Sequence, residues 1–292
     1  MARFSEPRFS PTKHFQGCFG LAYLSRIVLH LNAIWELLVE IMTGVVVLIH
    51  GLFGDLETWG NADEFLRRAL GSDYSVVKYS YQSKAWGRNP SIEEIAMQLE
   101  AWIDTTYPVA KYPDLKLFLA GHSMGGLVAK EYILSILRRG LAENLRVKGI
   151  VLAAVPNRGA QVAKIPRIFG GIQIKELKPF SWSAIKQFLG FSYTTTFVEK
   201  QHKEWMGHVN TSISYYAPST KTNMDVLVFY ATGDEVVDRR SATAIHPRAI
   251  PLDGNHTTIV KPTAEDDQII RSMVGFILCV SAAQLIDKRA KS

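Results

Sequence analysis

The 292-residue sequence predicts an α/β protein, in which a mostly parallel sheet carries helices on both faces. Short runs rich in β-branched residues alternate with longer stretches whose apolar residues recur at helical spacing. Strands that alternate with helices lie parallel, because each helix carries the chain back to start the next strand beside the last. The first run, 44–50, is mostly apolar, which is typical of a strand buried on both faces.

The elements follow one another in a regular order. Strands are expected at 44–50, 75–81, 115–120, 147–154, 226–231 and 249–252. Helices are expected around Leu66 and Leu70, over 92–103, directly after Gly121 and over 264–282. The stretch 157–223 breaks this rhythm and is too long for a bare loop. Its place between two core strands suggests a cap over the carboxyl edge of the sheet, the alternative being a helical excursion packed elsewhere.

Residues 1–41 form an N-terminal extension, so that the main domain is expected to span 42–292. Apolar residues between 21 and 41 recur every three or four positions opposite a polar face, which predicts an amphipathic helix and not a membrane span. Three roles stay open for it: covering an apolar patch of its own domain, peripheral contact with a membrane, or part of a targeting segment. Met42 is a candidate alternative start of translation.

The composition excludes several classes of protein. The formal net charge is +6, but the basic residues are scattered and no nucleic-acid-reading motif accompanies them, so no nucleic-acid partner is expected. Cys18 and Cys279 lie far apart in no metal-ligand pattern and are expected to be reduced thiols. We expect a cytoplasmic location, with the 21–41 helix as the candidate for membrane association.

The segment from Gly121 to Gly125 carries the strongest motif, G-x-S-x-G, directly after one apolar strand and directly before a helix. So tight a turn forces its central residue into strained backbone angles, and side chains two positions away on either side would collide. The turn lifts Ser123 above the sheet at a helix N-terminus, where N–H groups stabilise negative charge. We therefore expect Ser123 to be a nucleophile.

A serine hydroxyl needs a base to take its proton, and after this kind of turn an acid and a histidine follow along the chain. Asp234 comes just after the fifth strand, closer to its end than Glu235 or Asp238. His256 follows the sixth strand on a turn-rich loop. The predicted triad is therefore Ser123 as nucleophile, His256 as base and Asp234 as the acid that orients the base.

Backbone amides are expected to hold the negative charge that develops on the substrate. The loop after the first strand, HGLFG, offers the amide of Leu52 or Phe53, and the helix after the nucleophile offers that of Met124. We expect His50 to shape this loop through hydrogen bonds and His122 to point elsewhere. This chemistry needs no metal or cofactor.

Four motifs together resemble one branch of the α/β-hydrolases, the lipase-like serine esterases that include the serine-active-site-containing proteins and relatives of the glycosylphosphatidylinositol inositol-deacylases. The motifs are HGLFG at 50–54, GHSMGG at 121–126, GDEVV at 233–237 and HTTIVKP at 256–262. The segment 150–159 looks like the Thr-Pro-His-x-Gly turn of that family, with Asn157 where a histidine is common. The resemblance covers roughly residues 44–275 and implies an α/β-hydrolase fold and lipid or acyl-ester chemistry.

These observations lead to the hypothesis of a serine carboxyl-ester hydrolase that acts on an apolar acyl ester of a small molecule, with lipids among the candidates. The aromatic residues of 157–223 are expected to bind the acyl group. Two alternatives stay open: an acyltransferase or thioesterase with the same triad, and a non-catalytic α/β-hydrolase that serves as a binding module.

Overall fold

The computed structural model describes residues 44–83, 90–158, 193–210, 222–246 and 248–291. All of them belong to one compact unit, Met42–Ser292. The expectations for the amphipathic segment 21–41, for Cys18 and for most aromatic residues of 157–223 fall on residues outside the described ranges.

Six strands form one parallel sheet in the order β2-β1-β3-β4-β7-β8. The strands are β1 Gly44–Ile49, β2 Tyr74–Tyr79, β3 Lys116–His122, β4 Val147–Ala153, β7 Asp225–Ala231 and β8 Ile250–Leu252. Each coincides with a predicted strand to within two residues at either end, so the predicted α/β class is confirmed. A separate pair, β5 Val209–Asn210 and β6 Thr222–Asn223, was not expected from the sequence.

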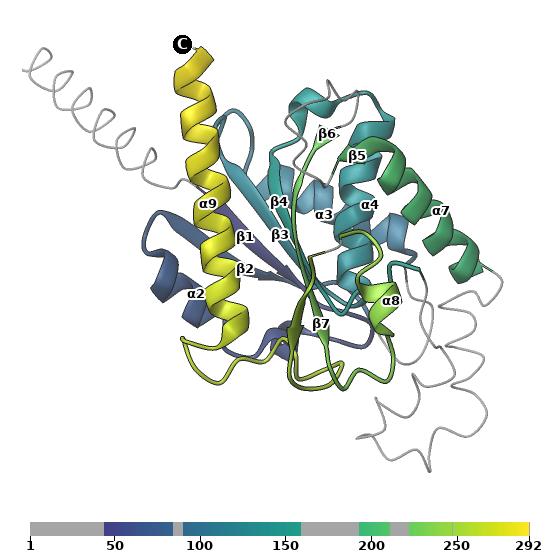
Figure 1. Ribbon diagram of the computed structural model, residues 1–292. Coiled ribbons are helices and arrows are strands. Elements are labelled where there is room, and N and C mark those ends of the chain that lie inside the picture. Colours follow the sequence, from purple (N-terminus) through teal and green to yellow (C-terminus); the bar gives the residue numbers. More distant parts are fainter. Residues whose placement is uncertain (1–43, 84–89, 159–192, 211–221, 247, 292) are drawn as a thin grey trace, which may run out of the picture. The chain divides into compact units, whose positions relative to one another are not determined.

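Helices cover both faces of the sheet (Figure 1). They are α2 Ala62–Leu70, α3 Ile92–Thr106, α4 Met124–Arg138, α7 Tyr193–His208, α8 Arg239–Ala242 and α9 Gln268–Lys291, with short 3-10 helices η1 Leu56–Trp59 and η2 Ala142–Asn144. α3 and α4 pack on one face, and α2 and α9 on the other. Within the described ranges, no helix has both the length and the apolar character needed to cross a membrane.

The strand β1 shows why the sheet needs both helical layers, since all six of its residues are buried. Val45, Val47 and Ile49 pack in the cluster that contains α3 and α4 residues. Val46 and Leu48 pack with α2 and α9 residues. Because successive side chains of a strand point to opposite faces, two-sided burial requires the continuous apolar run seen in the sequence.

The strand order reverses beside β1. The chain leaves β1 to form β2 on one side of it and later returns to form β3 on the other side. In open parallel sheets, the carboxyl ends of the strands at such a reversal form a ligand-binding crevice. The chain is close-packed there, because a Cβ added to Gly51 after β1 would lie 2.9 Å from the Cβ of Ser123 after β3.

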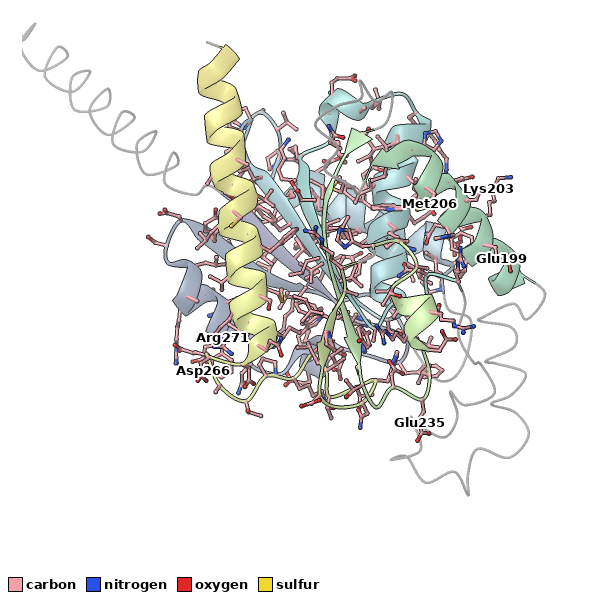
Figure 2. All side chains as sticks on the ribbon, viewed as in Figure 1. Glu199, Lys203, Met206, Glu235, Asp266 and Arg271 are labelled. Atoms are coloured by element: carbon pink, nitrogen blue, oxygen red, sulfur yellow. The ribbon has the colours of Figure 1, made fainter. Side chains whose placement is uncertain are left out.

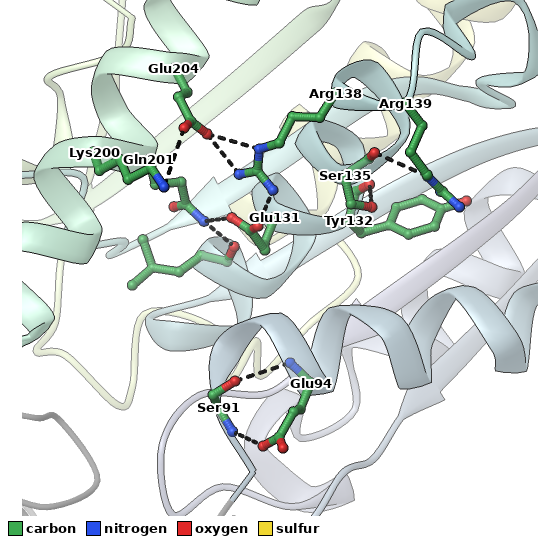
Figure 3. A network of polar contacts seen from close by, with 11 residues as sticks. Ser91, Glu94, Glu131, Tyr132, Ser135, Arg138, Arg139, Lys200, Gln201 and Glu204 are labelled. Atoms are coloured by element: carbon green, nitrogen blue, oxygen red, sulfur yellow. Dashed lines mark hydrogen bonds and ion pairs between the residues drawn. The ribbon is translucent and has the colours of Figure 1, made fainter.

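The helix α7 lies within the stretch 157–223 and packs beside α4 (Figure 1). Arg138 of α4 donates to Glu131 at 2.6 Å and to Glu204 of α7 at 2.7 Å, as Figure 3 shows. Gln201 of α7 donates to the buried carboxylate of Glu131 at 3.0 Å. Trp205 of α7 is fully buried in the same core cluster. This tryptophan therefore fills the core, contrary to the expectation that it lines an acyl-binding surface.

Candidate active site

Ser123 lies on the turn between β3 and α4 with φ 52° and ψ −122°. Backbone angles of this kind are rare outside glycine and cost of order 1–3 kcal/mol. The Ser123 amide donates to the carbonyl oxygen of Ala153 at 2.9 Å, which ties the turn to β4. The strained strand-to-helix turn predicted from the G-x-S-x-G motif is therefore present.

Three glycines allow this turn to close. A Cβ on Gly121 would collide with the backbone of Gly126, and one on Gly125 would collide with the carbonyl oxygen of His50. A Cβ on Gly126 would collide with the side chain of Val155, just beyond β4. Two of the three obstacles are backbone atoms, which cannot move aside as the end of a flexible side chain does. The motif thus needs glycine for space.

The structure brings the three predicted triad residues together. His256 Nε2 lies 2.9 Å from Ser123 Oγ, and His256 Nδ1 lies 2.9 Å from Asp234 Oδ2. An ionised carboxylate only accepts hydrogen bonds, so Nδ1 carries the imidazole proton and Nε2 is left to accept the hydroxyl proton of Ser123. The imidazole is 1% exposed and the carboxylate 3%. This arrangement can move a proton from the hydroxyl to the imidazole.

The second oxygen of Asp234 fixes the carboxylate in place. Oδ1 accepts the amide hydrogens of Val236 and Val237 at 2.8 and 2.9 Å. The two competing acids are engaged elsewhere or turned away. Asp238 caps the start of α8, and the exposed Glu235 points outward at the molecular surface (Figure 2). Asp234 is thus the acid that reaches the histidine.

His122 also contacts the histidine loop. The prediction that it points elsewhere is wrong in one respect, because its Nε2 donates to the carbonyl oxygen of His256 at 2.7 Å. The two rings lie 5.1 Å apart. Burial lowers the pKa of His122 to about 3, which keeps its ring neutral near pH 7. His122 therefore links the nucleophile turn to the backbone of the base.

The two candidate amides of the loop after β1 differ in their hydrogen bonding. The Phe53 amide donates to Ser83 Oγ at 2.6 Å. The amides of Leu52 and Met124, in contrast, donate to no residue in the described part of the chain. Leu52 and Met124 are each 6% exposed. Buried donors without a protein acceptor are suited to a developing negative charge, so the geometry favours Leu52 over Phe53 as the partner of Met124.

His50 fixes the start of this loop through hydrogen bonds. Its Nδ1 donates to the carbonyl oxygen of Gly51 at 2.8 Å, and its Nε2 accepts the amide hydrogen of Tyr81 at 3.2 Å. The Tyr81 hydroxyl donates to the carbonyl oxygen of His50 at 2.7 Å, and the two rings stack with centroids 4.0 Å apart. Burial lowers the pKa of His50, which maintains the neutral ring that this pattern requires.

A hollow of about 280 Å³ opens beside the same loop. Its lining includes Leu52, Phe53, Thr58, His122 and Lys261. This volume lies just below the range of pockets that enclose drug-sized ligands. The hollow therefore offers space for a small group beside the loop that follows β1.

A buried lysine that sequence reasoning missed connects α4, through Asn157, to the short helix α8. Lys130 of α4 is fully buried, and its Nζ donates to Asn157 Oδ1 at 2.7 Å. Asn157 Nδ2 in turn donates to the carbonyl oxygen of Ala242 at 2.9 Å. Asn157, at the position where the resembling family commonly has histidine, thus joins α4 to α8. No motif pairs residues 130 and 157, so the sequence contains no sign of this contact.

Comparison with known proteins agrees with the fold. Residues 46–278 match the alpha/beta hydrolase family, and the chain belongs to that family. The resemblance inferred from the four motifs is confirmed at the level of this superfamily.

Two curated bacterial proteins are similar to part of the chain. Phospholipase YtpA of Bacillus subtilis is 32% identical over 133 residues, which are 44% of this chain and 46% of that protein. A putative esterase/lipase of Haemophilus influenzae is 30% identical over 151 residues, 51% of this chain and 47% of that protein. The matched regions thus span about half the length of these relatives.

Among solved structures, ClbQ from the colibactin NRPS/PKS pathway superposes with a TM-score of 0.50. The superposition covers 82% of this chain and 99% of ClbQ, at 13% sequence identity. At so low an identity the likeness is one of fold alone.

Proposed function

We propose that the chain is a serine hydrolase that cleaves carboxylic esters of apolar acyl groups through a covalent acyl-enzyme. The observation that carries this proposal is the hydrogen-bonded series Asp234–His256–Ser123, with 2.9 Å at each link. Membership of the α/β-hydrolase family supports it, as do the names of the two relatives, a phospholipase and a putative esterase/lipase. A lipid ester is the favoured substrate class.

In the first half of the reaction, Ser123 Oγ attacks the ester carbonyl carbon while its proton passes to His256 Nε2. Asp234 stabilises the resulting imidazolium, and the amides of Leu52 and Met124 hold the negative charge on the former carbonyl oxygen. The ester C–O bond then breaks, and His256 gives its proton to the leaving alcohol. The acyl group remains on the serine.

The second half repeats these steps with water as the nucleophile. A water molecule attacks the acyl carbon while one of its protons passes to His256 Nε2. The bond between Ser123 Oγ and the acyl carbon breaks, the histidine returns the proton to the serine, and the carboxylic acid leaves. The same side chains and amides therefore serve both halves.

The test is hydrolysis of p-nitrophenyl esters of increasing acyl length by the full chain and its variants. Ser123→Ala and His256→Ala should each lose roughly 10⁴- to 10⁶-fold in kcat, and by similar factors, because the two residues act as a unit. His208→Ala changes an exposed histidine of α7 and should keep wild-type activity. The acyl length at which kcat/KM peaks reports the size of the acyl site.

Two other outcomes would redirect the proposal. Faster turnover of thioesters than of esters, or an ester product formed with an added alcohol, would indicate a thioesterase or an acyltransferase. A wild-type chain that hydrolyses none of these substrates and is not labelled by a serine-directed phosphonate would contradict catalysis by Ser123 and favour a binding module.

A further inference from the structure

The segment that follows β2 makes hydrogen bonds to the loop 50–54, which is called the oxyanion loop below. Ser83 lies in this segment, and its Oγ accepts the amide hydrogen of Phe53 at 2.6 Å. Thirty positions separate these residues in the sequence. At 2.6 Å this is a short N–H···O hydrogen bond.

Phe53 is held in a costly conformation at this point. Its φ is 57°, in the left-handed region that a bulky side chain rarely adopts and that costs of order 1–3 kcal/mol. Such a conformation persists only where surrounding contacts impose it. The hydrogen bond to Ser83 acts directly on the strained residue, so it is one of those contacts.

Tyr81, two residues before Ser83, holds the other end of the same loop. Its amide donates to His50 Nε2 at 3.2 Å, its hydroxyl donates to the carbonyl oxygen of His50 at 2.7 Å, and its ring stacks on the imidazole. Tyr81 is 8% exposed, so these bonds are shielded from water. Leu52 lies between the two anchored positions, and its amide is left without an acceptor among the described residues.

We propose that Ser83 and Tyr81 are positioning residues that aim the Leu52 amide at the oxyanion, with Ser83 fixing the far end of the oxyanion loop through the Phe53 amide. The proposal rests on the proposed function, because it assigns a role in stabilising the oxyanion of that reaction. Ser83 does not touch the substrate. Without the Ser83 hydroxyl, the Phe53 amide loses this hydrogen bond, the turn at Phe53 relaxes and the Leu52 amide no longer points at the oxyanion.

The experiment compares Ser83→Ala, Ser83→Thr and Tyr81→Phe with wild type on one p-nitrophenyl ester. Loss of an oxyanion donor costs about 10²- to 10³-fold in kcat. Misaligning one donor should cost less, so Ser83→Ala should lower kcat roughly 10- to 100-fold with KM within about twofold. Ser83→Thr keeps the hydroxyl acceptor and should recover most of the rate. Tyr81→Phe keeps the stacked ring but removes the hydroxyl, so its kcat should lie between those of wild type and Ser83→Ala.

Ser135→Ala is the matched control. Ser135 is a partly buried serine on α4 whose hydroxyl donates to the carbonyl oxygen of Tyr132 at 2.8 Å, so the variant also removes one side-chain hydrogen bond to the backbone. It should leave kcat and KM unchanged. A general loss of stability would affect both serine variants, whereas misalignment of the oxyanion amide affects only Ser83→Ala.

A trifluoromethyl ketone with the same acyl chain supplies a second measurement. Its adduct with Ser123 carries an oxyanion, so Ser83→Ala should weaken its inhibition by about the factor lost in kcat/KM. Wild-type kcat in Ser83→Ala, or a threonine variant as slow as the alanine variant, would overturn the proposal while leaving the proposed function intact. A wild-type chain that neither turns over esters nor reacts with the phosphonate would overturn both.

Discussion

The two carboxylate oxygens of Asp234 have separate roles. Oδ2 accepts the Nδ1 proton of His256 at 2.9 Å, whereas Oδ1 accepts two backbone amide hydrogens of its own turn. In an asparagine at this position, the oxygen could still accept the two backbone amide hydrogens. The NH₂ group would then face His256 Nδ1, and it cannot accept the imidazole proton. Charge and acceptor geometry at Asp234 therefore determine which nitrogen of His256 carries the proton.

Replacing Asp234 by asparagine should lower kcat for ester hydrolysis by about 10³- to 10⁴-fold with little change in the unfolding midpoint. The reason is that the amide favours the wrong imidazole tautomer, with the proton on Nε2 facing Ser123. Steady-state kinetics and thermal unfolding of the same sample would measure both effects.

Asp238→Asn is the control for this assignment. Asp238 caps α8, and asparagine caps a helix about as well as aspartate, so activity should stay within about twofold of wild type. Equal losses in the two variants would indicate that the acid had been assigned to the wrong residue.

Among the residues of the candidate site, those predicted from the sequence are the ones whose place follows from the motif or from the end of a strand. Ser123, Asp234 and His256 each lie just beyond a strand that the apolar pattern reveals. Ser83 and Lys130 could not be predicted in the same way. Ser83 contacts Phe53 across 30 positions, and Lys130 contacts Asn157 across 27, through folding that no local pattern encodes.

Helices and strands could be predicted where their buried residues are apolar and follow a regular pattern in the sequence. The helix α7, Tyr193–His208, is the clearest exception. Its contact with α4 includes Gln201, which donates to a backbone carbonyl oxygen and to Glu131 of α4, and Arg138 reaches across to Glu204 (Figure 3). A helix that packs partly through polar side chains lacks the apolar period by which helices are recognised. The pair β5 and β6, with two residues each, is too short to leave any period.

Two glycines in elements that touch each other should respond oppositely to alanine. Gly275 is exposed in the middle of α9, and a Cβ there meets nothing within 4 Å. Gly149 lies in β4, where a Cβ would come 2.8 Å from the ring of Phe276. Gly275→Ala should stabilise the protein by up to about 1 kcal/mol through helix propensity. Gly149→Ala should destabilise it by about 1–3 kcal/mol through overpacking.

Urea unfolding of both variants beside wild type would measure these changes. The slope of free energy against urea should stay constant, because neither change alters how much surface unfolding exposes. A destabilised Gly275→Ala would show that α9 is held away from regular geometry at its middle.

For the whole molecule, buried and partly buried basic groups make stability depend on pH. Burial lowers the pKa of His50, His122, His202, Lys130 and Lys148, to about 3 for His122 and about 7 for Lys130. Between the lowered pKa of each group in the folded chain and its ordinary pKa, the unfolded chain binds a proton that the folded chain does not. The free energy of unfolding therefore rises with pH, through the histidines up to about pH 6.5 and through Lys130 from about pH 7 toward 10.5; Lys148 adds to the upper part of the rise.

Urea unfolding at about pH 5.5, 7 and 9 should show increasing stability, with a slope of up to about 1.4 kcal/mol per pH unit for each proton. Lys130→Met should flatten the rise between about pH 7 and 9. It should also weaken the acidic part, because the charge of Lys130 helps to lower the pKa of His202. Lys203→Met alters an exposed lysine of α7 (Figure 2) and should keep the wild-type curve. A wild-type curve that is flat above about pH 7 would show that Lys130 is not buried as a neutral amine.

The order of the strands in the sheet was harder to predict from the sequence than the strands themselves. Alternating strands and helices predict a parallel sheet, but the order β2-β1-β3-β4-β7-β8 depends on which side of β1 each crossover returns to. The apolar pattern of β1 reports burial on two faces and not the identity of its neighbours. The close approach of Ser123 to the loop after β1 is thus a property of the connections between elements, which no single segment encodes.

Three residues other than glycine adopt positive φ in the described ranges, and each follows the end of a neighbouring strand. Phe53 follows β1, Ser123 follows β3 and Ala154 follows β4, with φ of 57°, 52° and 50°. Glycine would relieve the cost at positions 53 and 154. Selection for heat resistance alone would therefore enrich glycine at both positions, whereas the proposed function would retain the turn at Phe53 that adjoins the Leu52 amide. In any lineage of this protein kept at rising temperature, the turn at Phe53 is where stability and the proposed function would conflict.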